Sequence, residues 1–376
     1  MLTRKIKKPI QQDFFKGKAI ILVGARQVGK TTLIQEIQAQ MANKHTTKYL
    51  NLDNAGDLDR LTNVNFEDLN RLFANTDIIL IDEAQRLTSI GLVIKILVDN
   101  YKDKKQIVAT GSSSINLLDF TSEPLTGRKF TYHMFPLSLQ EIYKDQSALL
   151  KGYESNLIFG FYPEVVKTAA VEDKIRLLRE LATSYLYKDI LEFQDIRNPE
   201  VLGKLLQLLA LQIGSEVSYS ELGSSLGLDY KTVERYINLL EKAFVVFRLS
   251  SYSTNKRREV SKNKKIYFYD LGIRNTIIDN FNPVSLRTDV GQLWENFLIM
   301  ERMKYRDYNN IYAKQHFWRT YDNSEIDLVE DRDTKLYGYE FKWKKRVGRA
   351  PQSWQEYNNS EYIVVNQDNF SDFVFS

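Results

Sequence analysis

The sequence predicts an α/β fold whose N-terminal part is built on a parallel sheet. Three short apolar runs, AIILV at 19–23, IILI at 78–81 and QIVATG at 106–111, have the length and composition of buried strands. Between them lie TTLIQEIQAQMA at 31–42 and IKILVDNY at 94–101, in which apolar residues recur at helical spacing. Strands that are apolar on both faces and alternate with helices are typical of a parallel sheet covered by helices.

The composition limits the class of protein. The chain has 376 residues, enough for two or three domains. Hydrophobic residues at 43% and charged residues at 27% are typical of a soluble globular protein, and no apolar run approaches the roughly 18 residues that cross a bilayer. The basic N-terminus lacks the apolar core of a signal peptide, so we expect a cytoplasmic protein without a membrane partner. The absence of cysteine excludes disulfides, a cysteine nucleophile and a thiolate zinc site.

A phosphate-binding motif connects the first strand to the first helix. The segment GARQVGKT at 24–31 satisfies G-x-x-x-x-G-K-[ST] in the strand–turn–helix context that the motif requires. Glycines let the backbone N–H groups turn toward the phosphates, Lys30 supplies positive charge, and the Thr31 hydroxyl is a ligand for Mg²⁺. We therefore expect ATP or ADP, with Mg²⁺, to bind at Gly24, Ala25, Arg26, Gln27, Val28, Gly29, Lys30, Thr31 and Thr32.

Two acidic residues follow the second buried strand. We expect this strand to lie next to the strand of the phosphate-binding loop, so that Asp82 shares the Mg²⁺ with Thr31. Glu83 is then placed to act as the general base that polarises the attacking water. The alternative is that Asp82 and Glu83 only cap the helix that follows.

Two further residues are candidates for contact with the γ-phosphate. Ser112 belongs to the run TGSSS at 110–114, directly after the third strand, where a hydroxyl can sense the phosphate. The alternative is a serine-rich turn that caps a helix in INLLDF at 115–120. Arg128, in LTGRK, is a candidate arginine finger that would act on the site of a neighbouring copy in a homo-oligomer. It can equally be a structural or nucleic-acid-binding arginine.

These motifs carry a resemblance to a known family. GARQVGKTT, IDEAQRL, GSSS, LTGR and FPLSLQEI occur in the order found in AAA-type P-loop ATPases of bacteria and archaea, which the N-terminal half resembles. GFYPEVV, YLYKDIL and KIYFYDLGIRN resemble the C-terminal domain of uncharacterised function that accompanies this ATPase. The resemblance covers nearly the whole chain and implies an ATPase core, a helical lid, a winged helix and a C-terminal nuclease-like domain.

The middle segment resembles a winged helix-turn-helix. SELGSSLG would form the first helix and turn, and DYKTVERYINLLEKA would form the recognition helix. Val233, Ile237 and Leu240 are three or four residues apart, so one face of that helix is expected in the core. The residues left for base edges or phosphates at its N-terminal end are Tyr230, Lys231, Thr232, Glu234 and Arg235. Both DNA binding and a protein-contact role remain open.

Acidic residues in the last third form a second candidate site. Asp327 lies in a strand-like segment, and Glu340 and Lys342 alternate on one face of the next strand. Together with Glu295, on a helix, the two carboxylates are candidate ligands of a second Mg²⁺ or Mn²⁺, with Lys342 beside the attacking water. The pattern is similar to the PD-(D/E)xK nuclease fold, although Ile326 stands where that motif has proline. Catalysis stays open, because such a fold can also bind DNA without cutting it.

The charge distribution leaves the partner open. The net charge is +4, with basic runs at 5–8, 256–258, 262–265 and 342–349 that can face nucleic acid or form ordinary solvated surface.

Three segments are therefore expected: an AAA-type P-loop ATPase at 1–150, a helical lid with a winged helix at 151–252, and a nuclease-like α/β domain at 253–376. The expected function is ATP hydrolysis with Mg²⁺ by a protein that acts on or binds DNA. The alternative is an ATP-dependent regulatory switch that binds protein partners and has no nuclease activity.

Overall fold

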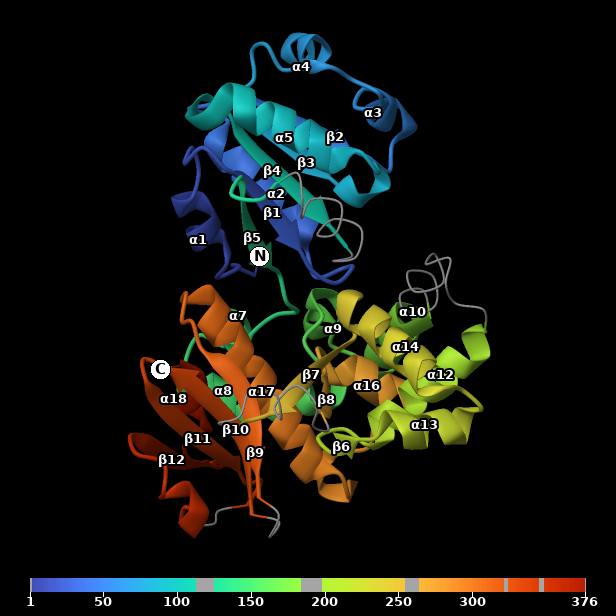
Figure 1. The fold of residues 1–376 in the computed structure, drawn as a ribbon, viewed down its shortest axis with the longest axis vertical. Helices are drawn as coiled ribbons and strands as arrows, with labels where there is room; N and C mark the ends of the chain where they lie inside the picture. Colours follow the sequence, from blue (N-terminus) through green and yellow to red (C-terminus); the bar gives the residue numbers. More distant parts are fainter. Residues whose placement is uncertain are drawn as a thin grey trace. The chain divides into compact units, whose positions relative to one another are not determined.

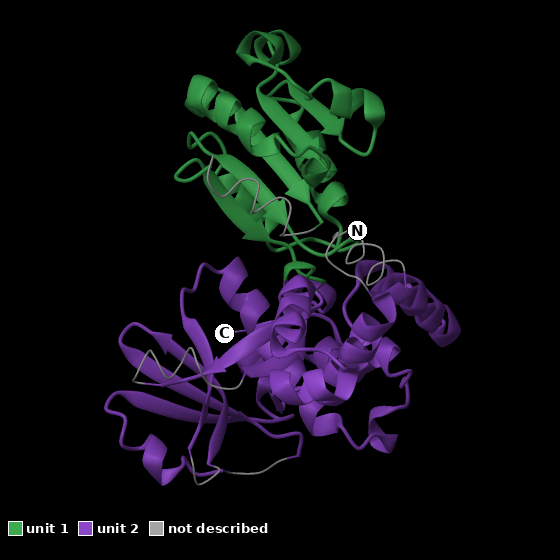
Figure 2. Ribbon diagram, turned by 45° about the vertical axis from the view of Figure 1, so that its right-hand side comes forward, with its two compact units in different colours: residues 1–136, 242–244 green, residues 137–241, 245–376 purple. Residues whose placement is uncertain are grey.

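The chain forms two compact units in the computed structural model (Figure 1). The structure describes residues 2–112, 125–183, 198–253, 264–320, 324–344 and 348–375. Unit 1 comprises residues 1–136 and 242–244, and unit 2 comprises residues 137–241 and 245–376 (Figure 2). Several predicted features lie outside the described residues, namely the helix at 115–120, the motif YLYKDIL at 185–191 and the basic run at 256–258.

Unit 1 is built on the predicted parallel sheet. Its strand order is β2-β3-β4-β1-β5, and each neighbouring pair is parallel. The central strands β1, β3 and β4 are buried along their whole length, which explains why they are apolar on both faces. The five strands are β1 (Ala19–Val23), β2 (Thr47–Asn51), β3 (Ile78–Asp82), β4 (Gln106–Gly111) and β5 (Lys129–His133).

One expectation about this sheet is wrong. The second buried strand, β3, was expected next to β1, but β4 lies between them. The carboxyl ends of parallel strands nevertheless share one edge of a sheet, so the segments that follow β1, β3 and β4 still meet there. The consequence is that β4 also contributes side chains to this edge.

Helices pack on the sheet of unit 1 through apolar faces. In α2, Leu33, Ile34 and Ile37 are buried, and in α5 the buried side chains include Ile94 and Leu97, as the helical spacing predicts. The helices of unit 1 are α1 (Lys7–Gln12), α2 (Lys30–Met41), α3 (Ala55–Asp59), α4 (Phe66–Leu72) and α5 (Ile90–Tyr101), with short 3₁₀ turns η1 (Ala84–Arg86) and η2 (Lys102–Lys104).

Unit 2 combines a helical part with a mixed sheet. The helices are α7 (Leu139–Ile142), α8 (Gln146–Phe159), α9 (Pro163–Lys167), α10 (Val171–Ala182), α12 (Pro199–Leu211), α13 (Tyr219–Leu226), α14 (Tyr230–Lys242), α16 (Leu271–Ile277), α17 (Val290–Tyr308) and α18 (Phe370–Phe375), with 3₁₀ turns η4 (Val284–Leu286) and η5 (Gln352–Trp354). The strands are β6 (Glu216–Val217), β7 (Val246–Ser251), β8 (Lys264–Phe268), β9 (Lys314–Arg319), β10 (Glu325–Arg332), β11 (Lys335–Phe341) and β12 (Ser360–Val365).

The sheet of unit 2 contains strands from both the predicted middle segment, 151–252, and the predicted C-terminal segment, 253–376. Its strand order is β12-β11-β10-β9-β7-β8-β6. The pairs β7–β9 and β11–β12 are parallel and the others are antiparallel. Strands β7 and β8 are paired although the predicted boundary at 252 and 253 falls between them. The division into segments at 151–252 and 253–376 stays a prediction.

The middle segment has a distinctive order of elements. Along the chain the elements follow the order α12, β6, α13, α14, β7, β8. The three strands of this series lie side by side in the sheet, with β8 between β6 and β7. Helix α14 buries Val233, Ile237 and Leu240, as its spacing predicts, together with Tyr236. Tyr230, Lys231 and Arg235 are exposed at its N-terminal end.

Two apolar layers enclose the other end of this sheet. On α17, Trp294 and Phe297 are fully buried, and the ring of Trp294 lies 5.1 Å from that of Phe370 on α18. A separate cluster contains Trp318, Ile326 and Trp354, with Val329 and Leu336. Ile326 and Val329 belong to the same cluster because a β-bulge lies between them in β10.

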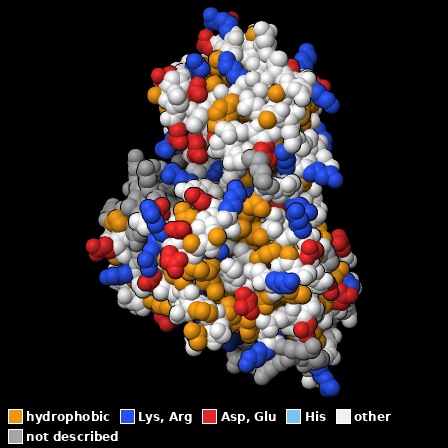
Figure 3. Space-filling model, turned by 180° about the vertical axis from the view of Figure 1, so that it is seen from behind, with side chains coloured by type: hydrophobic (Ala, Val, Ile, Leu, Met, Phe, Trp, Pro, Cys, Tyr) orange, Lys and Arg blue, Asp and Glu red, His pale blue; other side chains and the backbone are white. Residues whose placement is uncertain are grey.

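The described surface carries charges of both signs. Lys and Arg side chains are interspersed with Asp and Glu over the face drawn in Figure 3, without one continuous basic patch on that face. Among the described helices, none is long and apolar enough to cross a membrane.

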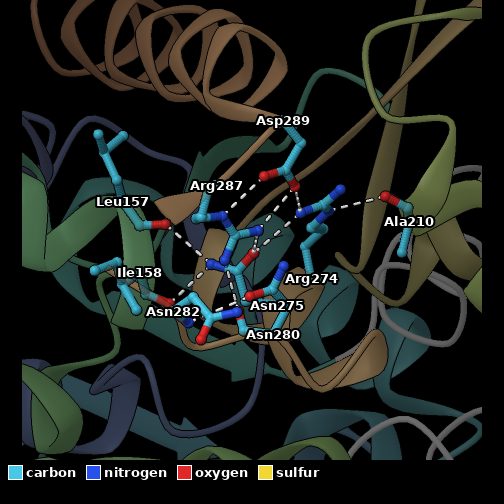
Figure 4. A network of polar contacts seen from close by, with 9 residues as sticks. All are labelled: Leu157, Ile158, Ala210, Arg274, Asn275, Asn280, Asn282, Arg287 and Asp289. Atoms are coloured by element: carbon cyan, nitrogen blue, oxygen red, sulfur yellow. Dashed lines mark hydrogen bonds and ion pairs between the residues drawn. The ribbon is translucent and has the colours of Figure 1, made fainter. Parts of the chain in front are cut away.

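A buried polar network holds α16 and the start of α17 in unit 2 (Figure 4). Arg274 and Arg287 both pair with Asp289, at 2.5 and 2.8 Å. Asn275 donates hydrogen bonds to the carbonyl oxygens of Leu157 and Ile158 on α8, at 3.0 and 2.9 Å. Burial raises the pKa of Asp289, but the hydrogen bonds and charges of the two arginines outweigh it and bring this pKa to about 2.

Candidate functional site

The glycines of the phosphate-binding loop are required by its backbone. The loop leaves β1 at Gly24, where a Cβ atom would lie 2.2 Å from the carbonyl oxygen of Met134. Gly29 has φ +99 and is the residue before the first turn of α2, a conformation that side chains disfavour. Larger residues at either position would displace the loop, so the motif spacing reflects geometry as well as chemistry.

Lys30 is buried inside this loop. Its Nζ atom donates hydrogen bonds to the carbonyl oxygens of Gly24 and Ala25, at 2.8 and 2.7 Å. The side chain is only 5% exposed, so the ammonium is held against the loop by these contacts. An anion that enters the loop meets a positive charge already fixed in place.

Thr31 and Asp82 meet at the edge of the sheet. The Thr31 hydroxyl donates to Asp82 Oδ2 at 2.7 Å, and the Tyr49 hydroxyl donates to the same oxygen at 2.8 Å. Thr110, from the intervening strand β4, donates to Asp82 Oδ1. A hydroxyl and a carboxylate side by side fit Mg²⁺, which prefers oxygen ligands. Sequence reasoning gave Tyr49 and Thr110 no contact with Asp82, because those contacts depend on the strand order.

The pKa of the Tyr49 phenol depends on its burial and on the carboxylate of Asp82. Burial, followed by the hydrogen bond and the charge of Asp82, raises the pKa of the Tyr49 phenol above its ordinary value. The phenol therefore stays protonated and keeps donating its hydrogen to Asp82.

The side chain of Glu83 contacts residues from the segments that follow β3 and β4. Gln85 Nε2 donates to Glu83 Oε2 and, at 3.0 Å, to Ser112 Oγ, and Ser112 Oγ lies 3.5 Å from Glu83 Oε2. Glu83 has φ +52, and its side chain makes no capping hydrogen bond to the short turn η1 that follows. The structure thus gathers Glu83, Ser112 and Gln85, and only Gln85 was missed from the sequence. Its place two residues after Glu83 in IDEAQ was the available signal.

Arg4 supports the phosphate-binding loop from the N-terminal segment. Its guanidinium donates to the carbonyl oxygens of Val28 and Phe135, both at 2.6 Å, and the residue is 7% exposed. Nothing in the local sequence distinguishes Arg4 from the basic residues that follow it.

Arg128 lies at the other end of β1 from the loop. Its carbonyl oxygen accepts a hydrogen bond from Ala19 N at the start of β1, whereas the loop follows the end of that strand. The guanidinium is exposed and its Nε donates to Asp99 Oδ1 on α5 at 2.5 Å. The predicted role of Arg128 in a neighbouring copy stays a prediction.

The predicted acidic residues of unit 2 lie near one another. Asp327 is at the β-bulge of β10, and its Oδ2 accepts a hydrogen bond from Phe341 N on β11 at 2.7 Å. Burial, together with the charges of Glu295 and Glu340, raises the pKa of Asp327 well above its ordinary value. Lys342 pairs with Glu340 Oε1, while the buried Glu340 Oε2 has no hydrogen-bond partner among the described residues.

A lysine that the sequence placed in a basic surface run enters the same cluster. Lys265 Nζ donates to Glu295 Oε1 at 3.1 Å and pairs with Glu325. The Tyr267 hydroxyl donates to the same oxygen of Glu295 at 2.5 Å. The Lys265 side chain is 4% exposed, so the expectation that the run at 262–265 is either solvated surface or a DNA-facing run is wrong for Lys265. Lys265 is buried because β8 lies between β7 and β6, and residues 265–268 of this strand are all buried.

This arrangement does not fit a divalent metal ion. Within the part of the chain that the structure describes, no group of three or more His, Asp or Glu side chains is arranged to hold one. An ammonium group, which repels a metal ion, lies against Glu295 and Glu325. The predicted ligation of a second Mg²⁺ or Mn²⁺ by Glu295, Asp327 and Glu340 is therefore not supported by the described geometry.

Family models match consecutive parts of the chain. Residues 16–143 match a model described as an AAA domain. Residues 150–284 and 290–371 match two models that are each described as a domain of unknown function. The first match covers the sheet, the phosphate-binding loop, Asp82 and Glu83, so unit 1 contains a P-loop ATPase domain of the AAA type.

Curated relatives are distant and extend over most of the chain. An uncharacterised protein of Mycobacterium tuberculosis is 26% identical over 336 residues, which cover 89% of this chain and 72% of the relative. An uncharacterised protein of Methanocaldococcus jannaschii is 24% identical over 353 residues, which cover 86% of this chain and 74% of the relative. One from Haemophilus influenzae is 24% identical over 349 residues, covering 86% and 82%.

Solved structures resemble the chain only weakly. Cdc6p from Pyrobaculum aerophilum has a TM-score of 0.33 and 14% identity, covering 74% of this chain and 94% of that one. A DNA replication initiation factor has a TM-score of 0.29 and 16% identity, and the match covers 63% of this chain and 86% of that one.

Proposed function

We propose that this protein hydrolyses ATP, with Mg²⁺, at the edge of the sheet in unit 1. The observation that carries the proposal is the contact of Thr31 Oγ1 with Asp82 Oδ2 at 2.7 Å, beside a buried Lys30. Thr31 and Asp82 would hold Mg²⁺, which neutralises phosphate charge when bound. Lys30 would exchange its contacts with the loop carbonyls for the β- and γ-phosphate oxygens.

Glu83 is the proposed general base. A base must reach the attacking water, and Gln85 and Ser112 now occupy or approach its Oε2 atom. We propose that Gln85 positions Glu83 until the γ-phosphate arrives and that the Ser112 hydroxyl then contacts that phosphate. This makes Gln85 a positioning residue and Glu83 the residue that accepts the proton.

DNA is the proposed partner of unit 2. The order α12, β6, α13, α14, β7, β8, with β6 and β7 flanking β8, is that of a winged helix, which supports this proposal. The first turn of α14 exposes Lys231 and, one turn later, Arg235, where a recognition helix meets phosphates or base edges. ATP binding in unit 1 would then alter the grip of unit 2 on DNA.

A protein-binding switch is the second candidate. The same helices expose apolar side chains, with Leu211 at the end of α12 61% exposed and Tyr230 at the start of α14 49% exposed. A protein partner would cover these apolar side chains. In this alternative the nucleotide state would control binding of a protein instead of DNA.

Arg128 receives a role in the proposal, whereas the acidic cluster of unit 2 does not. Arg128 would complete the site of a second copy in a homo-oligomer, because its guanidinium is exposed and is held at the surface by Asp99 and by the carbonyl oxygen of Thr126. Metal-dependent cleavage is not part of the proposed function, since the cluster around Asp327 does not fit a divalent ion.

Phosphate release with and without duplex DNA tests the proposal. We expect Mg²⁺-dependent release that DNA stimulates, and DNA affinity that falls steeply as salt increases, because phosphate contacts release counterions. ATP hydrolysis without any DNA effect would leave the ATPase assignment in place and favour the protein-binding switch. No hydrolysis and no affinity for ATP or ADP would contradict both.

A further inference from the structure

Lys265 lies among carboxylates that come from separate elements of unit 2. Its ammonium contacts Glu295 on α17 at 3.1 Å and also Glu325 on β10. Asp327, two residues after Glu325, is close enough for its charge to interact with Lys265. The Lys265 side chain is 4% exposed, and those of Glu295 and Glu325 are 14% and 31% exposed. A lysine this buried is stable only where carboxylates compensate its charge.

One oxygen of each of three of these carboxylates accepts a hydrogen bond from a protein donor, whereas the buried Glu340 Oε2 has no partner among the described residues. Glu295 Oε1 accepts hydrogen bonds from both Lys265 and Tyr267. Asp327 Oδ2 accepts from Phe341 N at 2.7 Å, and Glu340 Oε1 accepts from Lys342. The feature that opposes a divalent ion here is the ammonium of Lys265, whose positive charge repels that of Mg²⁺.

The backbone at Gly214 lies close to the Glu295 carboxylate. Gly214 has φ +74, and a Cβ atom there would lie 3.3 Å from Glu295 Oε2. Glu295 is thus enclosed by Gly214 on one side and by Lys265 and Tyr267 on the other.

We propose that Lys265 is the resident cation of this acidic cluster and takes the place that a divalent metal ion would need. The cluster consists of Glu295, Glu325, Asp327 and Glu340, with Lys342 on its edge. While the Lys265 ammonium is present, the cluster binds neither Mg²⁺ nor Mn²⁺ and does not support metal-dependent cleavage of DNA. This inference does not rest on the proposed ATPase activity.

Titration of the nucleotide-free full chain with Mn²⁺ tests the proposal. Electron paramagnetic resonance measures the Mn²⁺ that remains free at each step of the titration. We expect no site in the wild-type cluster up to about 1 mM Mn²⁺, the weak end of protein carboxylate sites. Lys265→Met removes the ammonium at similar length, and we expect it to gain one Mn²⁺ site at least about tenfold tighter than wild type. Lys265→Arg keeps the positive charge and should gain none.

Asp327→Asn assigns any Mn²⁺ signal to this cluster and separates it from the phosphate-binding loop. In Lys265→Met it should remove the gained site. A wild-type Mn²⁺ site that Asp327→Asn abolishes would overturn the proposal, as would a folded Lys265→Met without any gain. If Lys265→Met does not fold, the wild-type titration with and without Asp327→Asn decides alone: a site sensitive to Asp327 contradicts the proposal, and its absence supports it.

Discussion

The hydroxyl of Thr31 donates a hydrogen bond to Asp82 across the end of strand β4, at 2.7 Å. The two residues are 51 positions apart in the sequence: Asp82 ends β3, and Thr31 lies in the first turn of α2, which follows β1, a strand that is not a neighbour of β3. They meet because parallel strands end at one edge of the sheet. This contact defines where a phosphate-bound Mg²⁺ would lie and leads to the first prediction.

Thr31→Ala should increase the Mg²⁺ concentration needed for half-maximal ATP hydrolysis. The substitution removes one proposed oxygen ligand, and Asp82 remains as the other. The measurement is phosphate release over a Mg²⁺ titration at saturating ATP. Thr62→Ala is a matched control, because Thr62 is exposed and its hydroxyl donates to the carbonyl oxygen of Leu58. An unchanged Mg²⁺ dependence in Thr31→Ala would contradict the assignment.

Arg4→Ala should weaken both the stability of unit 1 and its affinity for ATP. The guanidinium gives the carbonyl oxygens of Val28 and Phe135 charge-assisted hydrogen bonds, each of which contributes about 1.5–3 kcal/mol to stability. Because Val28 belongs to the phosphate-binding loop, nucleotide affinity should fall too. Denaturant unfolding and ATP titration measure the two effects. A loss of stability with unchanged ATP affinity would indicate that Arg4 has only a structural role.

The pairing of Asp289 with two arginines should make stability depend on pH. The folded-state pKa of about 2 lies below the unfolded value, so the unfolded chain takes up a proton first as the pH falls. The stabilisation is present above pH 4, approximately the unfolded pKa, and is lost as the pH falls toward 2. Asp289→Asn should therefore be less stable than wild type at neutral pH.

The free energies of unfolding of wild type and Asp289→Asn, measured by denaturant at a series of pH values, test this. The difference between them should narrow only below about pH 4. A difference that stays constant as the pH falls further would show that folding does not lower the pKa of Asp289, which would contradict its pairing with the two arginines.

Lys231 and Arg235 on α14 should contribute to DNA affinity. Replacing both with alanine should weaken duplex binding and lower the slope of log affinity against log salt by about one for each phosphate that the two side chains neutralise. Lys151→Ala, an exposed lysine on α8, is the control and should leave the slope unchanged. Equal slopes for the double variant and the control would favour the protein-binding switch.

Local patterns were sufficient for the elements and for the phosphate-binding loop. The apolar runs predicted β1, β3 and β4, and the glycine spacing predicted the loop, because both depend on neighbours in the sequence. The side chains around Asp82 were not predictable in the same way. Tyr49 and Thr110 reach Asp82 only because β2 and β4 flank β3, an order that periodicity does not specify.

Lys265 shows the same limit in unit 2. As one of several basic residues in a run, it has the sequence environment of a surface residue. Its burial follows from the pairing of β8 with β6 and β7 and from the position of Glu295 on α17. The bulge in β10 that positions Asp327 was also absent from the pattern of alternation. Long-range pairing, more than composition, determines this cluster.

ATP binding and phosphate release in wild type, Glu83→Gln and Lys30→Ala decide whether unit 1 hydrolyses ATP at the proposed site. Glu83→Gln should retain ATP and lose turnover by roughly 10² to 10⁴-fold, the usual contribution of a general base. Lys30→Ala should lose turnover and bind ATP less tightly, while Lys44→Ala, at an exposed position after α2, should behave as wild type. Wild-type turnover in either Glu83→Gln or Lys30→Ala would show that ATP is not hydrolysed by these residues.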